Sequence, residues 1–174
     1  MNRPTAPVSL QVRIATRDDR TPIRRMLELY QHDLSDVWDQ DLDANGEYGY
    51  RLDGYWSHPQ CKAFTFLADG CYAGFALVDD DVTLPENQLW LAQFFVVKKY
   101  RRRGAGSAAA KQVFDQVRGR WEVGQMAGNL PAQTFWRRVI GEYTGGAFVE
   151  HELHDERWDG LLQCFDNTQP ARPV

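Results

Sequence analysis

The sequence predicts an α/β fold in which helices flank a mixed central sheet of about six to seven strands. Its length of 174 residues is typical of one domain, and we expect a single domain over 1–174. Short β-prone segments alternate with helix-periodic ones along the chain. Asp69-Gly70 joins two apolar runs as a hairpin turn does, so the sheet cannot be purely parallel.

The first third of the chain predicts one strand, one long helix and an irregular segment. Residues 9–15 alternate apolar and polar side chains, as a half-buried strand does. Thr21 and Pro22 look like an N-cap and a proline at the first helical position, and apolar residues then recur at helical spacing up to Leu34. Residues 35–61 are acidic and aromatic, and we expect a short helix plus loops there.

The remainder predicts a hairpin followed by strand-helix-strand-helix-strand-strand. The second of these helices would begin at Pro131 and stop at Gly145-Gly146. The expected strands are 62–68, 71–78, 88–97, 121–127, 148–154 and 158–165, and the expected helices are 105–117 and 131–143.

Composition excludes several classes of protein. Hydrophobic residues make up 43% and charged residues 25%, which excludes collagen-like and wholly disordered chains. The longest apolar stretch, 89–97, is about half of what a bilayer span needs, and the N-terminus lacks a secretion signal, so we expect a cytoplasmic protein without a membrane partner. The cysteines are an odd number without CxxC spacing, and the histidines show no ligand pattern. We therefore expect no metal, and free thiols at Cys61, Cys71 and Cys164.

Charge is distributed unevenly along the chain. Residues 31–60 contain seven acidic residues against one Arg51, whereas residues 98–120 contain eight Lys or Arg against one Asp115. An acidic surface attracts cations and a basic one attracts anions, so these stretches should face different ligands. Two solvated faces without a ligand are the alternative.

The basic stretch contains a candidate phosphate site between a buried strand and a helix. A helix N-terminus presents free N–H groups and the positive end of its dipole, and glycines allow the backbone to approach a phosphate. The basic and glycine residues of this turn are Arg101, Arg102, Arg103, Gly104 and Gly106.

Two other interpretations of this segment, a dinucleotide-binding site and a nucleic-acid-binding site, are disfavoured. The dinucleotide fingerprint GxGxxG/A fits 104–109, but the motif follows an antiparallel meander and too little chain remains for a Rossmann domain. Glu122 also lies at the start of the next strand, not at its end, where a ribose ligand belongs. The run 98–103 would suit nucleic acid, but the net charge of −4 argues against nucleic-acid binding.

These residues resemble the GNAT superfamily of acyl-CoA-dependent N-acyltransferases. The pyrophosphate loop of that family, Gln/Arg-x-x-Gly-x-Gly/Ala, matches 101–106. A second motif, an Asn followed by Ala and a Phe/Leu-Tyr pair, matches Asn129, Ala132, Phe135 and Trp136, with Trp in place of Tyr. With the element order, the resemblance covers nearly the whole chain and points to an uncharacterised branch.

The resemblance implies that acetyl-CoA is the co-substrate. Its pantetheine arm would pair with Phe94, Phe95 and Val96, and Asn129 would face the arm or cap the following helix. Trp136 would lie beside the sulfur. The pyrophosphate would contact the turn formed by Arg101, Arg102, Arg103, Gly104, Ala105, Gly106 and Ser107.

The implied reaction is direct attack of a primary amine on the thioester in a ternary complex, which needs a base and an acid. The acid position holds Trp136, whose indole does not release a proton at useful pH. The usual base positions match Gln93 and Gly124. Glu122 shares the strand face of Gly124 and becomes the candidate base, with a plain surface glutamate as the alternative.

The acceptor wall would come from the first helices and suits a small cationic amine. A regulatory acyl-CoA-binding module without turnover and a protein N-acetyltransferase are the alternatives, and a homodimer is left open. The candidate acceptor residues, each of which core packing or solvation would also explain, are Tyr30, Asp33, Ser35, Tyr50, Tyr55 and Trp56.

Overall fold

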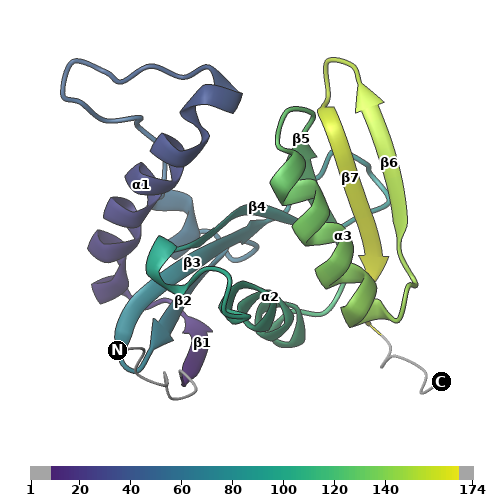
Figure 1. The fold of residues 1–174 in the computed structure, drawn as a ribbon, viewed down its shortest axis with the longest axis horizontal. Helices are drawn as coiled ribbons and strands as arrows, with labels where there is room; N and C mark the ends of the chain where they lie inside the picture. Colours follow the sequence, from purple (N-terminus) through teal and green to yellow (C-terminus); the bar gives the residue numbers. More distant parts are fainter. Residues whose placement is uncertain (1–8, 169–174) are drawn as a thin grey trace, which may run out of the picture.

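The computed structural model describes residues 9–168. Residues 1–8 and 169–174 of the expected 1–174 domain lie outside the described residues, and so does the beginning of the N-terminal segment in which we expect no secretion signal. One seven-stranded sheet has the order β1-β2-β3-β4-β5-β7-β6 (Figure 1). Within the described chain, no helix has the length and apolar character needed to cross a bilayer.

Each expected strand and long helix is present, with ends shifted by one or a few residues. In chain order the strands and α-helices are β1 (Leu10–Ile14), α1 (Arg20–Trp38), β2 (Lys62–Ala68), β3 (Cys71–Asp79), β4 (Leu89–Val96), α2 (Ala105–Gln116), β5 (Arg120–Met126), α3 (Leu130–Thr144), β6 (Val149–His154) and β7 (Asp159–Asp166). Three short 3-10 helices add η1 (Arg17–Asp19), η2 (Asp53–Trp56) and η3 (Lys98–Tyr100).

The sheet combines two antiparallel parts joined by one parallel pair. Strands β1 to β4 form an antiparallel meander, and β5, β7 and β6 form the second antiparallel part. Strand β4 is parallel to β5, as a strand-helix-strand crossover through α2 requires. The mixed sheet expected from the sequence is therefore confirmed.

The two central strands separate soon after they meet. Only Leu89 with Trp121 and Trp90 with Glu122 are in register between β4 and β5. Residues 91–96 of β4 consequently have no strand partner on that side. On its other side β4 contains a bulge, because Leu77 and Val78 of β3 face Gln93 and Leu91.

Helices cover both faces of the sheet. Helix α1 packs Ile23 and Leu27 against Phe75 and Phe95 on one face. Helices α2 and α3 pack against the other face in a larger cluster that includes Phe114. Figure 1 shows α1 beside the β2–β4 part and α3 beside β5 and β7, so the opening between β4 and β5 lies between these two helices.

Helix α1 begins earlier and ends later than expected. The N-cap is Asp19, not Thr21, because η1 leads directly into the helix. The Asp19 carboxylate accepts from the Thr16 amide and so caps η1, not α1. Pro22 is then the third helical residue. The short helix expected within 35–61 is the last turn of α1 together with η2. Helix α3 has the expected N-cap, where Asn129 Oδ1 accepts from the Ala132 amide at 3.2 Å.

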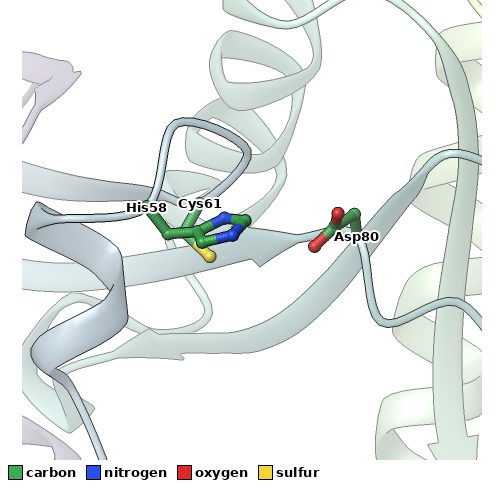
Figure 2. A group of neighbouring side chains, drawn as sticks. All are labelled: His58, Cys61 and Asp80. Atoms are coloured by element: carbon green, nitrogen blue, oxygen red, sulfur yellow. The ribbon is translucent and has the colours of Figure 1, made fainter.

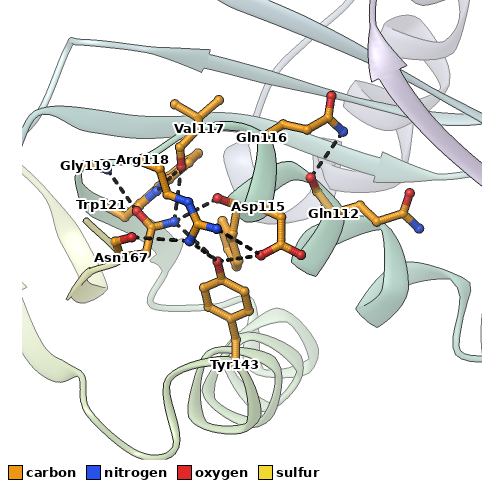
Figure 3. Close-up of polar contacts among 10 residues, drawn as sticks. Gln112, Asp115, Gln116, Val117, Arg118, Gly119, Trp121, Tyr143 and Asn167 are labelled. Atoms are coloured by element: carbon orange, nitrogen blue, oxygen red, sulfur yellow. Dashed lines mark hydrogen bonds and ion pairs between the residues drawn. The ribbon is translucent and has the colours of Figure 1, made fainter. Parts of the chain in front are cut away.

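A buried asparagine joins the end of the sheet to the turn between α2 and β5 (Figure 3). Asn167 follows β7 and is 5% exposed. Its Oδ1 accepts from the Gly119 amide at 2.9 Å, and its Nδ2 donates to the carbonyls of Phe114 and Val117 at 2.8 and 3.1 Å.

We expect Asn167→Ala to lower the free energy of unfolding by about 1–3 kcal/mol, because truncation leaves a buried amide and two carbonyls without this partner. Thermal and urea unfolding measure the loss. Exposed Asn45 supplies the control. Equal effects of Asn167→Ala and Asn45→Ala would show that this network does not stabilise the fold.

Candidate active site

Two cavities meet where β4 and β5 separate. One has a volume of about 890 Å³ and lies toward the β4–α2 turn. The other, of about 620 Å³, lies toward the ends of β3, β5 and β7. Residues that line both come from α1, β4 and the start of α3: they are Tyr30, Leu34, Phe94, Asn129, Ala132 and Trp136.

The larger cavity, which we call the basic groove, contains most of the predicted cofactor residues. Arg103 and Ala105 do not line it, although they belong to the same turn. Its charged residues are Lys98, Arg101, Arg102 and Arg138 against one Asp33. The predicted residues on its wall are Phe94, Phe95, Val96, Arg101, Arg102, Gly104, Gly106, Ser107, Asn129 and Trp136.

The turn into α2 has the geometry of an anion site. Gly104 is the N-cap with φ +79°, a conformation that residues with a Cβ rarely adopt. Ala108 is the first residue whose amide bonds back to Gly104, so the preceding amides of this turn are free for a ligand. A Cβ at Gly106 would lie 3.3 Å from the Phe135 ring, so helix α3 packs closely against this turn.

Asp33, predicted as an acceptor residue, lines the basic groove and not the smaller cavity. Its carboxylate is 2.6 Å from the Arg101 guanidinium and 3.2 Å from Lys98 Nζ. Burial by itself raises the pKa of Asp33, but the hydrogen bonds from Arg101 and Lys98 outweigh burial and lower it. Arg101 also donates from Nε to the Val96 carbonyl. These contacts fasten α1 to the end of β4.

The smaller cavity, which we call the acidic pocket, has the opposite charge. No Lys, Arg or His of the described chain lines it. Its indole and phenol rings are suited to an alkylammonium group. The acidic side chains are Asp39, Asp79, Asp81 and Asp159, and the aromatic ones are Tyr30, Trp38, Tyr50, Trp90, Phe94, Trp136 and Trp158.

A hydrogen-bonded series of two tyrosines and an aspartate lies at this pocket. Tyr55 donates its hydroxyl to Asp79 Oδ2 at 2.5 Å, and the hydroxyls of Tyr50 and Tyr55 are 3.4 Å apart. Burial raises the pKa of Asp79, and the charges of Asp80 and Asp81 act in the same direction, although the hydrogen bond from Tyr55 opposes them. Asp79 is therefore a carboxylate with increased proton affinity on the pocket wall.

The sequence model described as the acetyltransferase (GNAT) family matches residues 23–141, which is more than half of the chain. This chain belongs to the GNAT family. Membership makes it an acyl-CoA-dependent acetyltransferase, as the sequence predicted.

Several solved structures share the fold at low sequence identity. An acetyltransferase from Thermus thermophilus has a TM-score of 0.64 at 16% identity, over 90% of this chain and 95% of that one. The aminoglycoside acetyltransferase AAC(6')-Ib in complex with coenzyme A gives 0.61 at 11%, over 91% and 95%. RimJ from Mycobacterium smegmatis in complex with CoA-disulfide gives 0.61 at 15%, over 94% and 84%. Comparison with curated proteins finds no match.

The predicted base, Glu122, lies away from both cavities. Its side chain is fully buried and lines neither cavity. The carboxylate accepts from the amides of Thr83 and Leu84 at 2.7 and 3.0 Å and from Asn87 Nδ2 at 2.9 Å. Glu122 thus holds the loop between β3 and β4, which carries Asp81, and its oxygens already accept three hydrogen bonds there.

The other predicted acceptor residues differ in where they lie relative to the two cavities. Tyr30 and Tyr50 line the acidic pocket, and Tyr55 bonds to its wall. Trp56 lines neither cavity, because its indole N–H donates to the Thr16 carbonyl at 3.0 Å and its ring packs with the α1 side of the core. Ser35 donates to the His32 carbonyl and also lies outside both cavities.

Glu122→Gln should destabilise the protein by about 1–3 kcal/mol, because the amide offers one acceptor oxygen where three donors converge. Thermal unfolding measures this, and exposed Glu156→Gln is the matched control. Turnover should persist in the folded fraction. A variant with unchanged stability and abolished turnover would restore Glu122 as a base.

Proposed function

We propose that this GNAT acetyltransferase transfers the acetyl group of acetyl-CoA to the primary amine of a small cationic molecule, in the cytoplasm. The observation that supports this is the pair of joined cavities with opposite charge. The basic groove suits the phosphates of CoA, and the acidic pocket suits an ammonium group. The reacting groups would meet at the junction.

The proposed position of acetyl-CoA follows from free backbone groups. The unpartnered edge of β4 at 94–96 would pair with the amides of pantetheine like an added strand. The free amides after Gly104 would bind the pyrophosphate, with Arg102 beside it. Trp136 is 6% exposed and packs against Phe94 with ring centroids 4.9 Å apart, so in the proposed complex it would lie beside the arm at the junction.

In the proposed reaction the neutral amine attacks the thioester carbonyl directly. The C–N bond forms, the C–S bond breaks, and CoA leaves as a thiolate. Asp79 is the carboxylate that would take up the proton released by the amine, through water where the two are not in contact. Backbone amides at the β4 bulge, around Ala92, would stabilise the oxyanion.

The wall of the acidic pocket also contains two neutral polar groups. The Trp158 indole N–H and Gln125 Oε1 lie on its wall, and within the described residues neither buried atom has a hydrogen-bond partner. Turned toward the cavity, this donor and this acceptor would suit an amine that also carries hydroxyl groups. This favours a small polar amine over a protein N-terminus, the alternative acceptor.

Release of free CoA with a panel of amines tests the acceptor assignment. Hydroxylated di- and polyamines should be better substrates than anionic amino acids or peptides, and their KM should rise with salt because the attraction is screened. A best substrate with net negative charge, or a peptide N-terminus, would contradict the proposal.

Asp79→Asn should raise the KM of the cationic substrate by about 10–100-fold, which corresponds to the loss of one charged hydrogen bond. The acid limb of kcat/KM should also change. Burial raises the pKa of Asp79, so in wild type the rate should fall on acidification at a higher pH than for an ordinary carboxyl group. That limb should vanish in Asp79→Asn and persist in the control Asp166→Asn. An unchanged pH profile in Asp79→Asn would rule out the base role.

Gly104→Val should abolish the thermal stabilisation by CoA, which is about 2.7 kcal/mol at 100 times the dissociation constant. Valine is strained at φ +79°, so the free amides of the turn would move. Gly145→Val is the matched control, because Gly145 also has positive φ and open space but caps the far end of α3. Normal CoA stabilisation of Gly104→Val would show that the pyrophosphate binds elsewhere.

Trp136→Tyr should increase turnover at neutral pH, because the phenol of tyrosine can donate a proton to the leaving thiolate, whereas the indole of tryptophan cannot. General acid catalysis typically contributes about 10²–10⁴-fold. Tyr30→Phe is the companion variant, since Tyr30 also reaches the junction and burial raises the pKa of its hydroxyl, which keeps it protonated. If Trp136→Tyr lowers turnover while Tyr30→Phe abolishes it, Tyr30 is the proton donor and Trp136 only packs.

A further inference from the structure

Three potential metal ligands from two segments converge outside both cavities. His58 and Cys61 lie in the turn between η2 and β2, and Asp80 directly follows β3. One ligand atom of each, an imidazole nitrogen, the thiol sulfur and a carboxylate oxygen, lies within 4.8 Å of the other two. Figure 2 shows His58 and Cys61 side by side, with Asp80 facing them from the other strand end.

Backbone hydrogen bonds hold the turn that carries His58 and Cys61, and within the described residues the polar side-chain atoms of the three residues have no other partner. The His58 amide donates to the Gly54 carbonyl at 2.8 Å, and the Cys61 amide donates to the His58 carbonyl at 3.2 Å. Within residues 9–168, the imidazole, the thiol and the carboxylate make no hydrogen bond or ion pair. The turn therefore presents three groups at short range whose ligand atoms are free.

We propose that His58, Cys61 and Asp80 bind a divalent transition-metal ion of the zinc type. Thiolate, imidazole and carboxylate are the ligands that Zn²⁺ and Co²⁺ share, and three protein ligands leave a fourth tetrahedral position for water. Asp79 and Asp81 add negative charge on the same strand end. That charge favours a cation.

A catalytic triad with a cysteine nucleophile would use the same three residue types, but the geometry does not support such a triad. Such a site needs one hydrogen bond between thiol and imidazole and another between imidazole and carboxylate. Neither is present in the described structure.

A bound ion would connect the loop before β2 to the end of β3. Tyr55 in η2 lies three residues before His58 and already bonds to Asp79, the neighbour of Asp80. The ion would thus stabilise the part of the acidic-pocket wall that contains Tyr55 and Asp79. It would lie outside the cavity and would not contact a substrate. Its binding is separate from the acetyl transfer proposed above.

Cobalt titration of the metal-free full chain tests the site. Co²⁺ should give a thiolate-to-metal charge-transfer band in the near ultraviolet that saturates at one ion per chain and disappears when Zn²⁺ is added. Affinity should increase with pH, because the thiol must lose its proton to bind. Zn²⁺ should also raise the melting temperature.

Variants assign the ligands. Cys61→Ser should remove the band, and Asp80→Asn or His58→Ala should weaken cobalt binding by at least about tenfold. Cys71→Ser is the matched control, because Cys71 is an exposed free thiol at the start of β3, and it should keep the band. Circular dichroism checks that each variant is folded. Absence of a band in wild type, its persistence in Cys61→Ser, or its loss in Cys71→Ser would overturn the proposal.

Discussion

The separation of β4 and β5 is the constraint on which the rest of the structure depends. The strands share two residue pairs and then diverge, so the backbone of β4 beyond Trp90 has a free edge inside the protein. Unpaired backbone groups are costly unless water or a ligand meets them. The same divergence lets the basic groove and the acidic pocket meet at Tyr30, Phe94 and Trp136. A ligand with amide groups along an extended chain, such as pantetheine, matches this opening.

Charge is sorted around that opening by elements that are far apart in the sequence. The β4–α2 turn brings the arginines, and the ends of β3 and β7 bring Asp79, Asp81 and Asp159. Asp33 lies on the basic side, where its pairing with Arg101 fixes the turn against α1. Glu122 supports the other side from within the sheet, through the loop that carries Asp81. The proposal of one CoA-binding side and one amine-binding side rests on this arrangement.

Local patterns in the sequence were sufficient for the strands, the long helices and the glycine turn before α2, but not for the start of α1. Gly104 and Asn129 were predicted because a helix start depends on neighbouring residues. The acidic pocket was not, since Asp79 and Asp159 are at strand ends whose proximity depends on strand order. Strand alternation predicts that Glu122 and Gly124 lie on the same face of β5. It does not show that the loop between β3 and β4 covers Glu122. The grouping of Asp80 with His58 and Cys61 likewise depends on how the β3 end meets the turn before β2.

Hydrogen exchange of the backbone amides, with and without acetyl-CoA, tests the central claim most directly. The account predicts slower exchange for amides of 94–96 that do not bond to β3 and for those of 105–107, with β6 unchanged. Protection confined to other segments, or no protection at β4 under saturating acetyl-CoA, would contradict the assignment of this opening as the cofactor site.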